Sequence, residues 1–113
     1  MRIILKSKIN RAKITETNLY YEGSITIDKE IMEKADIVEG EKVEVLNLNN
    51  GSRTETYAIV GKPGQICLNG PAARLGHIGD EIIILAFAIE PEDKIGLSKP
   101  KVVYVDTNNR VKN

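Results

Sequence analysis

The Gly23-Ser24 pair is the part of this 113-residue chain whose residue types permit covalent chemistry. A serine hydroxyl is a poor nucleophile without activation, but Ser24 has one attack open to it without a base triad, on the carbonyl carbon of Gly23. The peptide then rearranges to an ester, and elimination across the serine Cα–Cβ bond breaks the chain. The serine remnant becomes dehydroalanine and hydrolyses to a pyruvoyl group. Glycine suits the position before serine, because it does not block the attack and tolerates a strained backbone. Alone, however, a Gly-Ser pair is more typical of a turn.

Other constellations of reactive side chains are missing from the sequence. His77 is the only histidine and Cys67 the only cysteine, so no Cys/His cluster with metal-ligand spacing exists. A Ser-His-Asp triad would need His77, which lies in the glycine-flanked stretch LGHIG and is interpreted as an exposed loop residue. Cys67 alternates within QICLN and is interpreted as a small buried residue. Since no Walker-type or dinucleotide-binding glycine pattern occurs either, an ordinary hydrolase or nucleotide enzyme is poorly supported.

Composition narrows the class of partner. Sixteen basic side chains balance sixteen acidic ones, which gives no electrostatic reason to expect nucleic acid or an anionic membrane surface. No apolar run approaches the length of a membrane span or of a signal peptide. A single cysteine permits no intramolecular disulfide, which suits a reducing cytoplasm. We therefore expect a cytoplasmic protein with no nucleic acid or membrane as partner.

The elements that must hold Gly23-Ser24 in place follow from alternation and turn signals. SITID alternates polar and apolar residues and predicts a strand directly after the glycine, and Asp28 is an expected N-cap for a short helix, KEIMEKA. A polar tail, 107–113, is expected to fray. About seven short strands are predicted in all, drawn from eight extended segments: 2–9, 12–15, 24–28, 43–48, 54–60, 65–69, 81–89 and 101–106. We expect one mainly β domain over residues 1–113, a small closed barrel of about six to seven strands with one or two short helices.

Four motifs connect the Gly-Ser pair to a known family. In chain order they are KINRAKIT, YYEGSITID, NNGSRTETYAI and ICLNGPAARLGHIGDEIIILAFA, which together run through most of the chain. In order and spacing they resemble the pyruvoyl-dependent aspartate 1-decarboxylases of pantothenate biosynthesis. The resemblance implies a double-psi β-barrel, a homotetramer with active sites between subunits, and self-cleavage into chains 1–23 and 24–113. The sequence leaves open whether cleavage is spontaneous or needs a maturation partner.

The resemblance also assigns roles to residues. Gly23-Ser24 matches the cleavage site, with Ser24 as the source of the covalent pyruvoyl cofactor. Tyr57 matches the proton donor, and Arg53 a carboxylate-binding arginine. Further residues match positions that line the site or assist cleavage: Lys8, Tyr21, Thr56, Asn69, Gly70, Pro71 and Ala72.

The reaction that the resemblance implies is the conversion of L-aspartate to β-alanine and carbon dioxide. The pyruvoyl ketone would form a Schiff base with the substrate amine and take up the electrons left by the departing α-carboxylate, as pyridoxal phosphate does elsewhere. Tyr57 is a suitable acid for protonating the resulting carbanion. Arg53 offers a planar fork that can hold a carboxylate through two bonds.

Two departures from the family pattern leave alternatives open. Asn10 stands where the family often has histidine, and it cannot titrate near neutrality. Pro71 interrupts the usual Asn-Gly-alanine run and removes one backbone N–H. One alternative is a barrel that never cleaves and serves only as a structural subunit. Another is a binding module of the DNA-binding transition-regulator type, although acids and bases are interspersed here rather than clustered.

Overall fold

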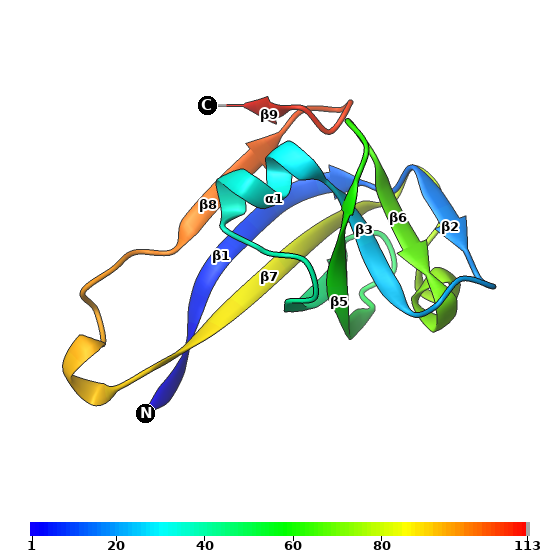
Figure 1. The fold of residues 1–113 in the computed structure, drawn as a ribbon. Helices are drawn as coiled ribbons and strands as arrows, with labels where there is room; N and C mark the ends of the chain where they lie inside the picture. Colours follow the sequence, from blue (N-terminus) through cyan, green and yellow to red (C-terminus); the bar gives the residue numbers. More distant parts are fainter. Residues whose placement is uncertain (113) are drawn as a thin grey trace.

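The computed structural model describes residues 1–112, and Asn113 at the end of the predicted tail and of the predicted 24–113 chain lies outside them. The chain is mainly β, as predicted (Figure 1). Nine strands occur, two more than the roughly seven predicted, together with one α-helix and two short 3-10 helices: β1 (Arg2–Lys13), β2 (Glu16–Asn18), β3 (Ser24–Asp28), α1 (Lys29–Ala35), β4 (Lys42–Asn47), β5 (Arg53–Gly61), β6 (Ile66–Asn69), η1 (Gly70–Leu75), β7 (Glu81–Glu90), η2 (Glu92–Lys94), β8 (Lys101–Val105) and β9 (Val111–Lys112).

The strands form one curled sheet in the order β2-β6-β3-β5-β4-β7-β1-β8-β9. Two strands have equivalent surroundings: β1 lies between antiparallel β7 and parallel β8, and β3 lies between antiparallel β6 and parallel β5. This interleaved pairing fits the double-psi barrel that the family resemblance implies. Within residues 1–112 no ladder joins β2 to β9, so backbone hydrogen bonds leave the barrel open at that seam.

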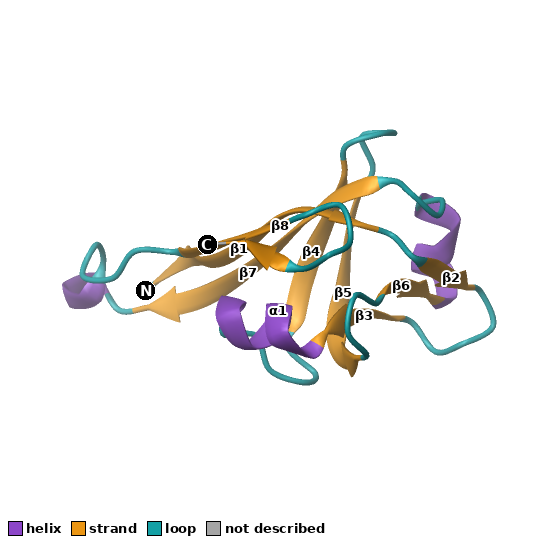
Figure 2. Cartoon of the chain, turned by 90° about the horizontal axis from the view of Figure 1, so that it is seen from above, coloured by secondary structure: helices purple, strands orange, loops and turns teal. Residues whose placement is uncertain are grey.

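The core is built almost entirely from branched aliphatic side chains that point into the curl. Ile9, Ile25, Ile27, Ile66 and Ile84 are completely buried, and each such side chain contributes about 1.5–3 kcal/mol through loss of water contact. The helix α1 packs across β1, β3, β5 and β8 (Figure 2). Its start is as predicted, because Asp28 Oδ1 accepts a hydrogen bond from the Ile31 N–H at 3.1 Å.

Two predictions about the strands and the C-terminal tail are wrong, because contacts between distant parts of the chain determine both regions. The two strands expected over 2–9 and 12–15 are one strand, β1, with register shifts against β7 and a left-handed Arg11 (φ 64°) that marks a bulge. The tail expected to fray is ordered in its described part, where β9 pairs with β8. Asn109 is buried there and donates to the carbonyl oxygens of Lys13 and Gly64, both at 2.9 Å. A short polar segment is therefore fixed by partners far away in sequence.

Candidate active site

Ser24 is completely buried at the first position of β3. It lies opposite Asn69, the last residue of β6, in the antiparallel β3–β6 ladder. The Asn69 side-chain Nδ2 donates to Ser24 Oγ at 2.9 Å, and Ser24 Oγ donates to the Glu22 carbonyl oxygen at 3.3 Å. The two strands thus hold the hydroxyl beside the Gly23–Ser24 peptide bond and away from solvent.

The backbone of η1 presses against Gly23. Gly70 has a positive φ of 64°, and a Cβ placed on it would come within 2.8 Å of both Gly23 N and Gly23 Cα and within 3.0 Å of the Tyr21 carbonyl oxygen. Only glycine permits this approach. Pro71 also faces the pair, since its Cδ lies 3.6 Å from where a Gly23 Cβ would stand. Ala72 is buried behind them in the core, so the predicted loop residues gather beside the Gly23-Ser24 pair.

Pro71 occupies the first turn of η1. The N–H groups of a helical first turn have no partner within the helix, and a proline at this position is therefore tolerated without loss of an internal bond. The departure from the family pattern at Pro71 accordingly costs no hydrogen bond within η1.

Tyr57 lies beside Ser24 across the β3–β5 pair. The parallel register pairs Ile25 with Ala58, and stepping back one residue on each strand places Ser24 next to Tyr57. Because aligned side chains share a face, both point away from the core that Ile25 and Ala58 enter. Tyr57 is 39% exposed, so its ring is open to a ligand from solvent while Ser24 is closed off.

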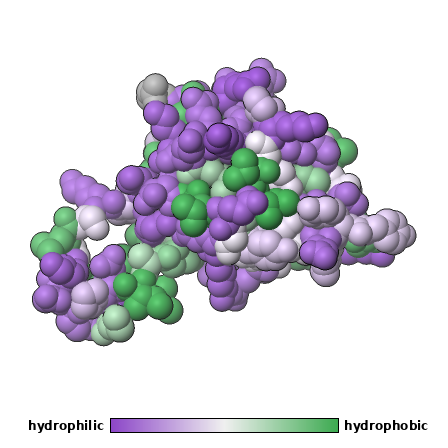
Figure 3. Space-filling model, viewed as in Figure 1, coloured by the Kyte–Doolittle hydropathy of each residue, from purple (hydrophilic) through white to green (hydrophobic). Residues whose placement is uncertain are grey.

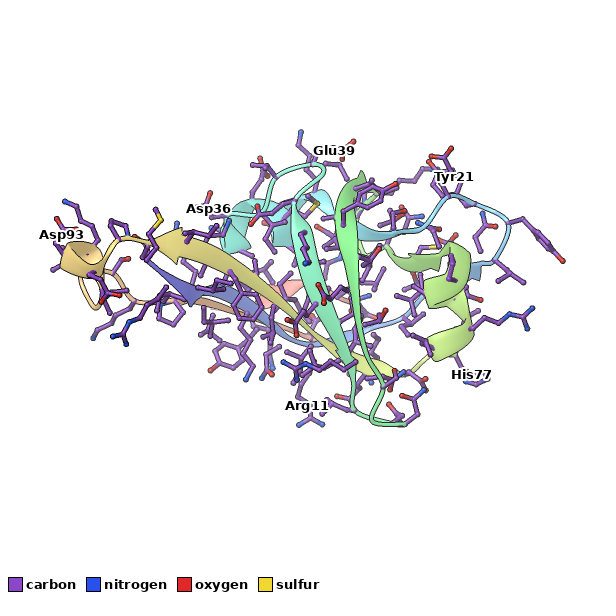
Figure 4. All side chains as sticks on the ribbon, turned by 90° about the horizontal axis from the view of Figure 1, so that it is seen from below. Arg11, Tyr21, Asp36, Glu39, His77 and Asp93 are labelled. Atoms are coloured by element: carbon purple, nitrogen blue, oxygen red, sulfur yellow. The ribbon has the colours of Figure 1, made fainter. Side chains whose placement is uncertain are left out.

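Thr56 and Tyr21 approach the same peptide from other sides. The same register, continued one further residue, places the half-buried Thr56 opposite Gly23, with its side chain on the other face from Tyr57. Tyr21 lies in the loop between β2 and β3 at the η1 end of the molecule, where Figure 4 labels it, and its side chain is exposed. The backbone of Tyr21 is close to Gly70 and so to Gly23, because a Cβ on Gly70 would lie 3.0 Å from the Tyr21 carbonyl oxygen.

Arg53 and Lys8 are not brought to Ser24 within one chain. Arg53 is four residues before Tyr57 on β5, about 13 Å along the strand, and its Nε donates to Glu44 Oε1 at 2.9 Å. Lys8 lies on β1, which three strands, β5, β4 and β7, separate from β3 in the sheet. Asn10, at the position where the family often has histidine, lies on the same strand opposite Tyr104 of β8.

Two residues at this site escaped the sequence analysis. Thr26 Oγ1 accepts the second hydrogen of the Asn69 amide at 2.9 Å, and Cys67 Sγ donates to Asn69 Oδ1 at 3.2 Å. Cys67 is buried as predicted, and burial raises the pKa of its thiol. The alternation in SITID and in ICLN was the available signal, because it places Thr26 with Ser24 and Cys67 with Asn69 on the faces that meet.

A polar staple links η1 to the β4–β5 turn. The Leu75 carbonyl oxygen at the end of η1 accepts hydrogen bonds from the side chains of Asn47, Asn50 and Ser52 at 2.9–3.2 Å. Asp80 Oδ2 accepts from Asn47 Nδ2 at 3.0 Å and from the His77 N–H at 2.9 Å. These bonds, the one from Asn47 first, hold the pKa of Asp80 below its ordinary value. The His77 side chain is exposed, as predicted.

The described residues contain no group of three or more His, Cys, Asp or Glu side chains placed to hold a metal ion. Among the helices of residues 1–112, none has the length and apolar character needed to cross a bilayer.

The sequence of this chain is similar to those of known proteins. The family model described as aspartate decarboxylase matches residues 1–112. A protein named aspartate 1-decarboxylase from Thermoanaerobacter pseudethanolicus is 56% identical over 111 residues, covering 96% of this chain and 95% of its own length. One of the same name from Caldicellulosiruptor saccharolyticus is 54% identical over 110 residues, covering 96% and 86%.

A solved structure, that of the rationally designed mkDPBB_sym_86 protein, superposes with a TM-score of 0.49 at 17% identity, covering 66% of this chain and 90% of the designed one. That similarity is too low to support an argument. The match of the family model along residues 1–112 and the curated relatives above half identity lead to one conclusion: this chain belongs to the aspartate decarboxylase family.

Proposed function

We propose that this chain cleaves itself between Gly23 and Ser24 and then decarboxylates L-aspartate to β-alanine and carbon dioxide, for pantothenate synthesis in the cytoplasm. The observation that carries the proposal is the buried Ser24 hydroxyl, held by Asn69 at 2.9 Å beside a glycine against which Gly70 is packed. In a chain of the aspartate decarboxylase family, this arrangement is suited to an intramolecular acyl shift.

The cleavage step needs no external nucleophile. Ser24 Oγ forms a bond to the Gly23 carbonyl carbon, the C–N bond to Ser24 breaks, and the hydroxyl proton passes to the released nitrogen. Loss of the Ser24 Cα proton then expels the Gly23 carboxylate and leaves dehydroalanine. Its imine tautomer reacts with water and releases ammonia, and a pyruvoyl group remains at the start of chain 24–113. The Asn69 amide, which donates to Ser24 Oγ, is placed to stabilise negative charge on that oxygen when the carboxylate departs.

The residues around Ser24 suit such a group. It would occupy the place of the Ser24 side chain, between the Asn69 amide and the backbone of Gly70 and Pro71. When present, it supplies a carbonyl that takes up the substrate amine and accepts the electron pair left by the departing carboxylate. The half-exposed Tyr57, alongside on β5, has a phenolic proton to deliver to the substrate carbon.

Substrate recognition falls to the positively charged side chains on the outer face. The Arg53 side chain is 59% exposed, and only its Nε is engaged by Glu44. The remaining N–H groups of its fork can hold a carboxylate through two bonds. The family resemblance assigns Thr56, Tyr21, Asn69, Gly70, Pro71 and Ala72 to substrate binding, and we propose that role for them.

We infer that a second copy of the chain completes the site, as in the homotetramer that the family resemblance implies. Three strands lie between Lys8 on β1 and Ser24 on β3, and Arg53 is about 13 Å along β5 from Tyr57. We therefore infer that both side chains serve the site of a neighbouring copy. The sheet face around Lys8 supports this, because it exposes large apolar side chains: Ile3, Ile89, Val102 and Tyr104. Figure 3 shows apolar surface near the projecting end of the molecule, and monomers rarely expose contiguous apolar area.

A nucleic-acid-binding role is not favoured. Exposed basic side chains are paired with neighbouring acids, as Arg11 is with Glu81 and Lys42 with Glu55. Phosphate recognition needs clustered, free Lys and Arg side chains.

The test is the intact mass of the purified protein under denaturing conditions, with Ser24→Ala as the control. We expect two fragments split between Gly23 and Ser24, the larger carrying a pyruvoyl mass at its N-terminus, and β-alanine formation from L-aspartate. The Ser24→Ala chain should stay whole and inactive. A whole wild-type chain that remains whole after incubation with extract of the source cells would remove the proposal, whereas cleavage only in extract would identify a maturation partner.

A further inference from the structure

Four buried polar side chains from β3 and β6 form a closed hydrogen-bonded set. The ladder pairs Ser24 with Asn69 and Thr26 with Cys67. All four side chains are at most 8% exposed. They lie on the face of β3 and β6 that points away from the isoleucine core, and the bonds between them converge on one amide, that of Asn69.

Each polar atom of the Asn69 amide has a partner. Its two N–H groups donate to Ser24 Oγ and Thr26 Oγ1, both at 2.9 Å, and its oxygen accepts from Cys67 Sγ at 3.2 Å. The alternative orientation, with the amide turned over, would direct N–H groups at a thiol, which is a weak acceptor. The thiol therefore selects the orientation in which nitrogen faces Ser24, and the Thr26 hydroxyl holds the amide plane on that line.

We propose that Thr26 and Cys67 are positioning residues for chain cleavage, which aim the Asn69 amide at the Ser24 hydroxyl. Within residues 1–112 neither side chain hydrogen-bonds to Gly23 or Ser24, and both act through Asn69. The proposal rests on the proposed self-cleavage and adds to it which residues, besides those at the bond, set its rate.

The orientation of the Asn69 amide affects Ser24 Oγ, the oxygen that attacks in the acyl shift. In the acyl shift Ser24 Oγ bonds to the Gly23 carbonyl carbon as the C–N bond breaks and the proton moves to nitrogen. The oxygen is fixed from one side by the Asn69 N–H and from the other by the Glu22 carbonyl. If the amide swings or turns over, this oxygen loses its fixed place, and small displacements of reacting atoms are costly in rate.

The test compares Thr26→Val with Thr26→Ser, and Thr54→Val is the matched control because Thr54 is a half-buried threonine on β5 away from the set. Each chain is made by cell-free synthesis, and the whole and cleaved masses are followed over time, with any maturation partner that the wild type needs present throughout. We expect Thr26→Val to cleave about five- to tenfold more slowly than wild type, as loss of a hydrogen bond predicts. Thr26→Ser and Thr54→Val should cleave at rates close to wild type. A merely structural role for Thr26 would lower the unfolding midpoint without this dependence on the hydroxyl.

A second pair tests the other end of the amide. Cys67→Ser keeps a donor toward Asn69 Oδ1 and should cleave at the wild-type rate, whereas Cys67→Ala should cleave slowly. If Thr26→Val does not fold, this pair of variants tests the positioning role by itself. Cleavage of Thr26→Val and Cys67→Ala at the wild-type rate would overturn the proposal while leaving self-cleavage intact. A wild-type chain that never cleaves would instead refute the proposed function itself.

Discussion

The two halves of the candidate site differ in how far one chain completes them. Around Ser24, the β3–β6 ladder and η1 bury every polar group and supply each with a partner: the hydroxyls of Ser24 and Thr26, the Cys67 thiol and the Asn69 amide. The side chains of Arg53, Tyr57 and Lys8 are half-buried or exposed, and they lie on two strands, β5 and β1, that are not neighbours in the sheet.

The difference follows from what each half must do. In the function that we propose, cleavage happens once, within a single chain, and its groups must be fixed before any ligand arrives, so burial and complete hydrogen bonding are an advantage. Substrate must enter and leave many times, so its charged contacts need access to water. We infer that changes in the buried half act on cleavage and changes in the exposed half act on turnover, and the following predictions test that division.

Tyr57→Phe has the largest expected effect on turnover. The variant should cleave at the wild-type rate, because the hydrogen bonds to the Asn69 amide do not involve the Tyr57 hydroxyl, but kcat should fall by about two to four orders of magnitude, as for loss of a positioned acid. Kinetics of β-alanine formation by fully cleaved protein provide the measurement. The control is Tyr104→Phe, another exposed tyrosine, on β8. Wild-type kcat in Tyr57→Phe would exclude Tyr57 as the proton donor.

Gly70→Ala alters the buried half of the site, around Ser24. The added Cβ would meet Gly23 at 2.8 Å at a residue with φ 64°, so η1 must move off the cleavage site, and cleavage should slow by about a hundredfold. Gly51→Ala is the matched control, because Gly51 has φ 75° and nothing within 4 Å of its Cβ position. It bears the same backbone strain without the collision. Equal slowing in both variants would attribute the effect to strain alone.

Arg53→Lys should raise KM for aspartate by about tenfold or more with little change in cleavage. Lysine keeps the charge but loses the planar fork that binds a carboxylate through two bonds. Arg11→Lys is a suitable control, since Arg11 forms a similar exposed pair with Glu81 at 2.7 Å. If Arg53→Lys impaired cleavage as much as binding, the division between the two halves would be wrong at this residue.

How much the sequence predicts depends on how local the determining interaction is. The start of β3 and the Asp28 cap of α1 were predicted to the residue, because neighbouring residues determine them. The short strands β2 and β9 were missed, because they exist only through pairing with β6 and β8. Buried Asn109 was likewise assigned to a frayed tail, since its partners Lys13 and Gly64 are distant in sequence.

Within the site, too, the sequence predicts the residues that local motifs mark and misses those that depend on distant pairing. Residue types and motif order were enough to nominate Ser24, Asn69 and Gly70, and the structure gathers these three in one place. Thr26 and Cys67 carry no motif of their own, and their contribution becomes visible only when the β3–β6 register is known. For Lys8 the reverse is true. The family resemblance predicts it as a site residue, but its place on β1 does not bring it to Ser24 within one chain.

Asp80→Asn should have the smallest effect, and it tests how the two halves are joined. Asp80 and Asn47 belong to the staple that ties η1 to the β4–β5 turn, and their hydrogen bond, with that from the His77 N–H, lowers the pKa of Asp80. A lowered folded-state pKa gives stability that is present above the ordinary aspartate pKa of about 3.9 and is lost as pH falls through the lower folded value. Asp80→Asn should therefore lower the unfolding midpoint by a few degrees at pH 7, and the difference from wild type should vanish at pH well below 3.9. Because both halves keep their own contacts, cleavage and turnover at pH 7 should change less than twofold.

A large loss of either activity at an unchanged unfolding midpoint would contradict this expectation. It would mean that the hydrogen bonds of the staple couple the β4–β5 turn, which precedes Arg53, to Gly70 beside the predicted cleavage site, so that the two halves act as one.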